Sequence, residues 1–237
     1  MNKLNKDFVS TILATMFAAG SVFAGETYSG FSIGIVGNNA EYDTKGKEIE
    51  GTGDGEVTPG QATQAVDFPS FFLEYTRGDV GGGVSMTFGA EFIPDKESIG
   101  SKSRTDTTDS SEDSSDSGTY TAKGEVKNAV SAYIEPGYMF NDYIGFYGKA
   151  GVSHVKVVSL EDIALGASSS EYGDQNVLGG MLGGGIKLIT PWGLFTKLEY
   201  TETKFEKVVL KSTSGGQNEI HASPTMSAIR LNLGWNF

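Results

Sequence analysis

The chain has no cysteine, only two histidines, and no long apolar run after its first 24 residues. The absence of cysteine excludes a disulfide framework. The longest later apolar run, Val177 to Ile186, stops at Lys187, well short of the ~20 residues that a membrane-spanning helix needs. A net charge of −12 argues against nucleic acid as a partner. If the chain beyond residue 24 crosses a membrane, it therefore has to do so with strands.

The first 24 residues have the features of a secretory signal peptide. Lys3 and Lys6 begin a basic start, Phe8 to Ala19 form a short apolar core, and Val22-Phe23-Ala24 supplies the small residue and spacing of a cleavage site. The apolar core is too short for a membrane anchor. We therefore predict export and cleavage after Ala24, with residues 25–237 as one mature domain.

The last segment, Met226 to Phe237, alternates strictly between two kinds of residue. Ile229, Leu231, Leu233, Trp235 and Phe237 are apolar, whereas the positions between them are polar or glycine. A period of two predicts a strand with one apolar and one polar face. No later segment of the sequence can cover the apolar face, which makes lipid the candidate cover.

Seven earlier segments show the same two-faced pattern. The eight predicted strands span 28–42, 68–76, 83–94, 126–140, 143–158, 177–190, 194–210 and 226–237. Long polar loops are predicted near 43–66, 95–123, 159–176 and 211–223, and short turns lie between the other strands.

This alternation of long and short connections predicts a closed architecture. An even number of strands joined in this way is typical of an antiparallel up-and-down barrel with both termini on one side. In transmembrane barrels the short turns are periplasmic and the long loops extracellular. The sequence therefore predicts an all-β, eight-stranded antiparallel up-and-down transmembrane β-barrel.

The faces opposite the apolar residues carry equal numbers of acidic and basic residues. An eight-stranded barrel is just wide enough for its own side chains to fill it, so charges inside it need partners. We predict a neutral interior network and a filled, polar core in place of an open pore. Its eight members are Glu74, Glu91, Glu135, Lys149, Lys187, Lys197, Glu199 and Arg230.

Several short stretches resemble a known group of proteins. They are Tyr133 to Tyr138 and Tyr147 to Val152, which flank a two-residue turn, and the terminal Trp235-Asn236-Phe237. With the signal peptide and eight strands, they are similar to the small outer-membrane β-barrel superfamily, which includes opacity-type proteins, Ail/Lom-type proteins and the membrane domain of OmpA-like proteins.

The resemblance implies a location in the outer membrane of a Gram-negative-type cell more than it implies an activity. It implies outer-membrane lipid, lipopolysaccharide and the barrel-assembly machinery as partners. It also implies that the terminal apolar face, formed by Leu231, Leu233, Trp235 and Phe237, serves as the assembly signal.

Catalysis has one candidate pair. His221 and Ser223 resemble the His-x-Ser pair of outer-membrane lipid A deacylases, but Pro224 follows where that family continues with Asn, and no adjacent acid is evident. A triad needs a base and an orienting acid within hydrogen-bond reach. We therefore expect no enzyme activity, and a lipid A-modifying enzyme stays an alternative.

The 95–123 loop contains clustered carboxylates that could hold Ca²⁺. The spacing of an EF-type loop is absent, so a solvated loop is the preferred interpretation. The candidates are Asp106, Asp109, Glu112, Asp113 and Asp116.

The sequence thus predicts a monomeric surface protein with a structural, adhesive or shielding role. It needs no cofactor, and its loops are expected to contact an extracellular or host ligand. A narrow passive pore and a soluble secreted barrel are further alternatives.

Overall fold

The structure is a computed structural model that describes residues 29–49, 57–78, 82–94, 96–106, 118–163, 173–212 and 219–237. The predicted signal peptide and the carboxylates Asp109, Glu112, Asp113 and Asp116 lie outside these residues. Within the described parts of the chain, no helix is long and apolar enough to cross a membrane. Every regular element among the described residues is a strand: β1 (Gly30–Ile49), β2 (Val57–Arg77), β3 (Val84–Ile93), β4 (Glu97–Asp106), β5 (Gly118–Met139), β6 (Ile144–Ile163), β7 (Gln175–Ile189), β8 (Leu194–Phe205), β9 (Val208–Lys211) and β10 (Glu219–Asn236).

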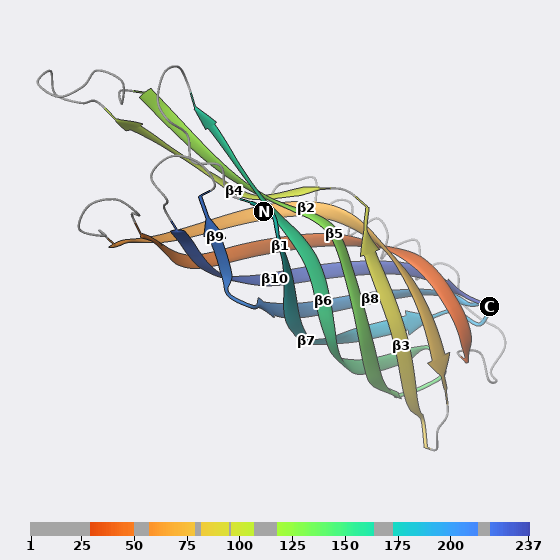
Figure 1. Cartoon of the computed structure of the whole chain (residues 1–237). Helices are drawn as coiled ribbons and strands as arrows, with labels where there is room; N and C mark the ends of the chain where they lie inside the picture. The colour runs from red at the N-terminus through yellow and green to blue at the C-terminus, as the bar shows by residue number, and fades with distance from the viewer. Residues whose placement is uncertain are drawn as a thin grey trace, which may run out of the picture.

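The strands close into a barrel (Figure 1). Antiparallel pairs run in the order β1-β2-β3-β5-β6-β7-β8-β10, and β10 pairs with β1 to complete the ring. Strand β4 pairs with β5 beyond β3, and β9 pairs with β10 beyond β8, so each prolongs its predecessor. The eight-stranded antiparallel barrel predicted from the sequence is confirmed.

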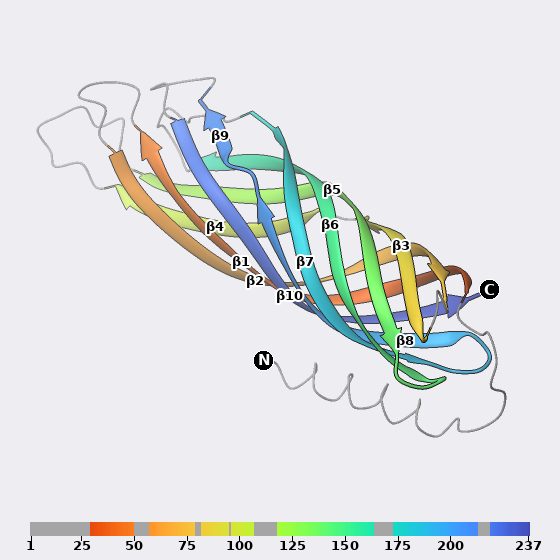
Figure 2. The same ribbon diagram turned by 90° about the horizontal axis from the view of Figure 1, so that it is seen from below.

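The register of the pairs fixes how steeply the strands tilt. Partners followed once around the ring from Phe31 return to β1 at Glu41, ten residues further along. Eight strands with that stagger tilt by about 40° from the barrel axis, so each residue adds roughly 2.5 Å of height. The oblique course of the long strands is visible in Figure 2.

Exposed apolar side chains form a belt around the outside, which we call the apolar band. Its members include Phe31, Ile33 and Ile35 on β1, Phe71 and Leu73 on β2, Phe88 and Phe92 on β3, Val130 and Ile134 on β5, Phe146 and Val152 on β6, Leu182 and Ile186 on β7, Leu198 and Tyr200 on β8, and Ile229 on β10. With the stagger taken into account, the band is roughly 20–25 Å tall, close to the height of lipid-facing belts. It ends at similar heights on most strands. The first polar outward residues above it are Asn39, Asp67, Asn128, His154, Glu202 and Ser227, while β7 carries one further exposed leucine, Leu178.

The strands continue far beyond this band, which corrects the predicted loop boundaries. Near 43–66 the sequence predicts a loop, but β1 runs to Ile49 and pairs with β2 from Val57 onward. Near 95–123, β4 and the start of β5 form a hairpin, and β6 and β10 likewise extend into the 159–176 and 211–223 regions. Backbone pairing there does not require the apolar outward face on which the strand prediction relied. We call this part of the barrel the extension.

The inside of the barrel changes character at the same height. At the level of the band the buried positions carry the charged residues and many hydroxyl and amide side chains. In the extension they carry two apolar clusters, which we call the upper core. Its buried members are Val126, Ala129, Val155, Val157, Val177, Val208 and Leu210 in one cluster and Ala40, Phe68 and Ala228 in the other. At the band the barrel is apolar outside, and inside it the charged and polar side chains share the lumen with a small apolar cluster: Val36, Phe72, Met139, Ile189 and Phe195. Above the band the interior is apolar and the outward positions are mostly polar.

Candidate functional site

All eight predicted interior charges lie inside the barrel, on seven strands. Their exposed fractions range from 1% for Lys197 to 8% for Lys187. Strand alternation places them there, because they occupy the inward positions of strands whose alternate positions face outward. They are also the charged residues that are buried in the described part of the chain.

Arg230 on β10 joins the upper members of the set. Its Nη2 contacts both carboxylate oxygens of Glu91 on β3, and its Nη1 lies 2.8 Å from Oε1 of Glu199 on β8. Its Nε donates a hydrogen bond of 2.8 Å to Oδ1 of Asn38. A guanidinium bound on three sides in this way is fixed in orientation.

Two lysines continue the connection downward. Nζ of Lys149 lies 3.1 Å from Oε1 of Glu199 and 3.3 Å from Oε1 of Glu135. Nζ of Lys197 lies 2.6 Å from Oε2 of Glu135 and 2.5 Å from Oε1 of Glu74. The contacts therefore form one alternating series, which we call the ion-pair chain: Glu91, Arg230, Glu199, Lys149, Glu135, Lys197 and Glu74.

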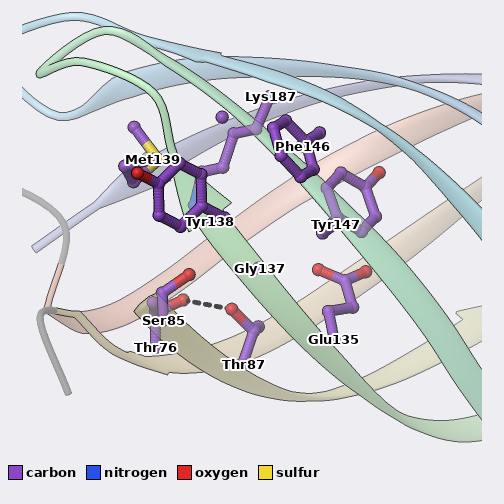
Figure 3. Close-up of a pocket in the computed structure, with 11 residues that line it drawn as sticks. Thr76, Ser85, Thr87, Glu135, Gly137, Tyr138, Met139, Phe146, Tyr147 and Lys187 are labelled. Atoms are coloured by element: carbon purple, nitrogen blue, oxygen red, sulfur yellow. Dashed lines mark hydrogen bonds between the residues drawn. The ribbon is translucent and has the colours of Figure 1, made fainter. Parts of the chain in front are cut away.

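Lys187 is the eighth charge, and it is not part of this chain. Among the described residues no carboxylate lies within 4.0 Å of its Nζ, which sits 4.4 Å from the centre of the Phe195 ring. The lysine lines a cavity of about 20 Å³, room for one water molecule, with Glu135, Tyr147, Thr76 and Thr87 in its wall (Figure 3). The ion-pair chain contains four carboxylates and three cations, so the positive charge of Lys187 makes the interior neutral without a direct ion pair.

Uncharged side chains also belong to the network, although the pattern of charges in the sequence did not predict them. Tyr133 donates a 2.8 Å hydrogen bond to Glu74, and Tyr147 donates one of 2.7 Å to Glu199. Ser70 donates to Glu91 at 2.6 Å. The signal for Tyr133 was an inward tyrosine opposite an inward glycine, because a Cβ on Gly89 would lie 2.3 Å from the Tyr133 ring.

The catalytic candidates lie elsewhere, on the outside of the extension. His221 and Ser223 occupy outward positions of β10, and an acid that the sequence analysis missed is present: Oε2 of Glu219 lies 3.0 Å from Nε2 of His221. Period-two spacing places residues 219 and 221 on one face, which is the signal that could have revealed it. Lys211 also contacts Glu219 at 2.6 Å, and the hydrogen bonds from Lys211 and His221 lower the pKa of the Glu219 carboxyl below its usual value.

The histidine and the serine are not coupled in the described contacts. Ser223 is exposed, and no hydrogen bond joins its hydroxyl to His221 within the described region. His221 lies eight residues beyond Ile229, the last apolar outward residue of β10, which is about 26 Å along the strand. The pair therefore stands well above the apolar band.

Of the carboxylates predicted as a calcium site, the structure describes Asp106, which ends β4. The part of the chain that the structure describes contains no group of three His, Cys, Asp or Glu residues that could hold a metal.

The residues predicted as the assembly signal lie at the short-turn end of the barrel. Leu231, Leu233, Trp235 and Phe237 all face outward there, with Phe237 71% exposed. The Trp235 ring packs edge-on against Trp192, with 6.1 Å between ring centres.

Comparison with known proteins identifies a family. The family model described as outer membrane protein beta-barrel domain matches residues 10–237. Similar solved structures include Ail of Yersinia pestis in complex with the heparin analogue sucrose octasulfate, at 14% identity and TM-score 0.37, covering 85% of this chain and 99% of Ail. Neisserial surface protein A gives 13% identity, TM-score 0.39 and coverage of 88% and 98%. OprG from Pseudomonas aeruginosa gives 14%, 0.41, and 88% and 97%. No curated protein sequence matches the chain.

Proposed function

This chain belongs to the outer membrane protein beta-barrel domain family, and on that premise we propose that it is a closed, monomeric surface protein. Its role is structural or interactive: the barrel anchors the extension in the outer membrane, and the extension presents the long hairpins to the cell exterior for adhesion or shielding. Partners are outer-membrane lipid, lipopolysaccharide and an extracellular or host ligand. Delivery by a cleaved signal peptide and recognition of Phe237 by the assembly machinery belong to the same proposal.

One observation carries this proposal: two different layers fill the interior. The ion-pair chain crosses the lumen at the level of the apolar band, and the upper core fills it above, with exposed fractions between 2% and 7%. A continuous water-filled path of the kind that larger porins possess is not supported by such packing. The side chains block passage, and the strands beyond the band serve display.

The length of the extension supports a display role. Strand β1 continues fourteen residues beyond Ile35, its last residue in the apolar band, a path of about 45 Å along the strand. Hairpins of this length lift their tips clear of the membrane surface. A barrel that only had to span the bilayer needs strands of about 9–11 residues.

A surface-attachment assay tests the proposal. Cells that display the wild-type chain are compared with cells that display a variant whose β1–β2 and β5–β6 hairpins are cut back to the band, on immobilised extracellular-matrix proteins and in serum survival. We expect the trimmed barrel to migrate as folded on unboiled gels and to lose attachment or survival. Equal attachment and equal survival of the two strains would refute the interaction role.

A lipid A-modifying enzyme is the second candidate, and the contact of Glu219 with His221 is the observation that favours it. Two features weigh against it: the hydroxyl of Ser223 is not engaged by His221, and the height of the pair above the band separates it from acyl chains. The test is mass spectrometry of lipid A from cells that overexpress the wild type or the Ser223→Ala variant. Lipid A that loses an acyl chain only with the wild type would establish the enzyme.

A further inference from the structure

Strand β5 carries an irregularity where it leaves the apolar band. Its pairing with β6 shifts between Lys127 and Val130, which marks a β-bulge. Asn128, inside the bulge, has φ 51°, the one positive φ among the described residues other than glycine. A bulge with an unusual backbone angle re-aims the side chains beside it, and such sites are often functional.

The bulge decides which way Lys127 points. Val130 and Asn128 are exposed, and simple alternation would continue with Val126 outward and Lys127 inward. Instead Val126 is 6% exposed inside the upper core, and Lys127 takes the outer face with 36% of its side chain exposed. The bulge thus reverses the directions of the two side chains, so that Val126 points inward and Lys127 points outward.

On the outer face Lys127 meets a second lysine. The register places it directly opposite Lys156 of β6, whose side chain is 38% exposed. Like charges directly opposite on neighbouring strands are destabilising. The backbone irregularity therefore brings two like charges opposite each other, an arrangement that a shared anion would stabilise.

Nearby acids compensate this charge only in part. Nζ of Lys156 lies 2.6 Å from Asp174, and Nζ of Lys127 and of Lys96 each lie 3.7 Å from a Glu125 oxygen. Among the side chains that the structure describes here, three lysines therefore face two carboxylates, and the two contacts of Glu125 are too long for hydrogen bonds. The described side chains around Lys127 and Lys156 thus carry more positive than negative charge, whereas the first polar residues above the band on β2 and β8 are Asp67 and Glu202.

At the height of the pair, its lysine side chains come within reach of a lipid headgroup. Lys156 lies four residues beyond Val152, the last residue of the apolar band on β6, and is therefore about 10 Å above the band at the tilt of the strands. The headgroup region extends about 5–8 Å from the hydrocarbon core, and lysine side chains reach toward it.

We propose that Lys127 and Lys156 form a site on the outer face of β5 and β6 for the phosphate group of an outer-leaflet lipid headgroup. The site rests on the orientation given under the proposed function, with the extension outside the cell. The β5 bulge exists to present Lys127 to this phosphate. Because binding of a purified lipid in detergent is independent of adhesion, failure of the lipid site leaves the display role standing, and the reverse also holds.

Native mass spectrometry of the refolded full chain in detergent tests the site with diphosphorylated lipid A as the probe. We expect one retained lipid A in the wild type, and roughly thirtyfold weaker retention in the Lys127→Gln/Lys156→Gln variant, as expected for the loss of two cations near a lipid surface. The matched control, Lys45→Gln/Lys47→Gln, removes two exposed lysines of the extension and should bind as the wild type does. Asn128→Gly keeps the positive φ and should also bind normally.

Two further probes separate a lipid site from a general phosphate site. Dephosphorylated lipid A should bind as weakly to the wild type as diphosphorylated lipid A binds to the double glutamine variant, and inorganic phosphate should not compete at lipid-equivalent concentrations. Unchanged binding by the glutamine variant, equal binding of dephosphorylated lipid A, or equally tight binding of inorganic phosphate would each overturn the proposal. Lys127→Arg/Lys156→Arg, which keeps both charges, must retain binding, so a folding defect in the glutamine variant leaves the proposal testable.

Discussion

The band and the extension are built from the same strands but solve opposite solvation problems. In the band, β10 directs Leu231 and Leu233 outward and Arg230 inward. In the extension the arrangement is reversed: on β6, Val155 and Val157 point inward and Lys156 points outward. One barrel therefore behaves as a membrane protein over its lower part and as a soluble β-protein above it, which indicates that its surroundings change from lipid to water at that level.

The two interiors also hold together by different forces. Apolar packing of the upper core is non-directional and tolerates small losses. The ion-pair chain depends on each partner, because a single removed charge leaves its neighbours buried and uncompensated. Substitutions in the two regions should therefore differ in cost.

The largest effect is expected at the centre of the ion-pair chain. Glu199→Gln removes the carboxylate that contacts Arg230 at 2.8 Å and Lys149 at 3.1 Å. We expect a loss of about 3–5 kcal/mol in the free energy of unfolding, measured by urea titration in lipid vesicles. The matched control is Glu202→Gln on the outer face, whose pair with Lys204 is exposed and should change stability by less than about 1 kcal/mol. A similarly small change in the free energy of unfolding for both variants would show that the ion-pair chain contributes little to stability.

The next largest effect is expected when a lysine is introduced on the outer surface, because its cost in folding stability should differ between the band and the extension. Ile134 lies on the outside of the band and is 43% exposed there, so Ile134→Lys should cost about 2–4 kcal/mol in vesicles. Thr63→Lys, at an exposed outward position of the extension, should be nearly neutral. Equal costs for the two lysines would place the edge of the lipid elsewhere.

A smaller loss is expected from trimming the upper core. Val177, which is 2% exposed, packs with Val155 and Val208, and Val177→Ala removes two methyl groups. The expected cost is about 1–2 kcal/mol, and hydrogen exchange should localise it to the extension while amides of the band stay protected. Uniform loss of protection through the whole barrel would mean that the two regions unfold as one unit.

The smallest effect concerns an exposed group of the extension. The pKa of Glu219 is lowered by its hydrogen bonds with Lys211 and His221, so its contribution to local stability is present above its usual pKa and is lost as pH falls through the lowered value. Carboxyl NMR titration should show this low pKa in the wild type. Lys211→Gln should raise the pKa toward the ordinary range, and an unchanged titration would show that the pair does not form in solution.

The sequence predicts the band better than the extension for a physical reason. Lipid imposes apolar residues at every second outward position, as in Ile229, Leu231 and Leu233, and this leaves a strict pattern. Strand β2 between residues 57 and 66 pairs fully with β1, yet its Gln, Thr, Gly and Ala residues carry little periodicity and read as a loop. Because this part of the strand faces water and not lipid, its outward positions need not be apolar, and no alternating pattern is imposed on its sequence.

The membership of the interior network was predictable, but the partners were not. The alternation of inward and outward positions along β10 is enough to place Arg230 inside the barrel. Its contact with Glu91, and not with Glu74, depends on the stagger of ten residues around the ring. Lys187 shows the same limit, since overall neutrality predicts a partner for it but no carboxylate among the described residues reaches its ammonium group. Pairing is a property of the closed barrel.

Cysteine scanning along β10 tests the change of surroundings most directly, because the natural chain has no cysteine to interfere. Single cysteines at the outward positions 221, 223, 225, 227, 229, 231 and 233, and at the inward positions 226 and 228, are reacted with a charged, membrane-impermeant maleimide on the folded protein in vesicles. The account predicts reaction at 221 to 227 and protection from 229 onward through 233, together with protection of the inward positions 226 and 228. Reaction at 231, or protection that continues to 221, would contradict the boundary between band and extension.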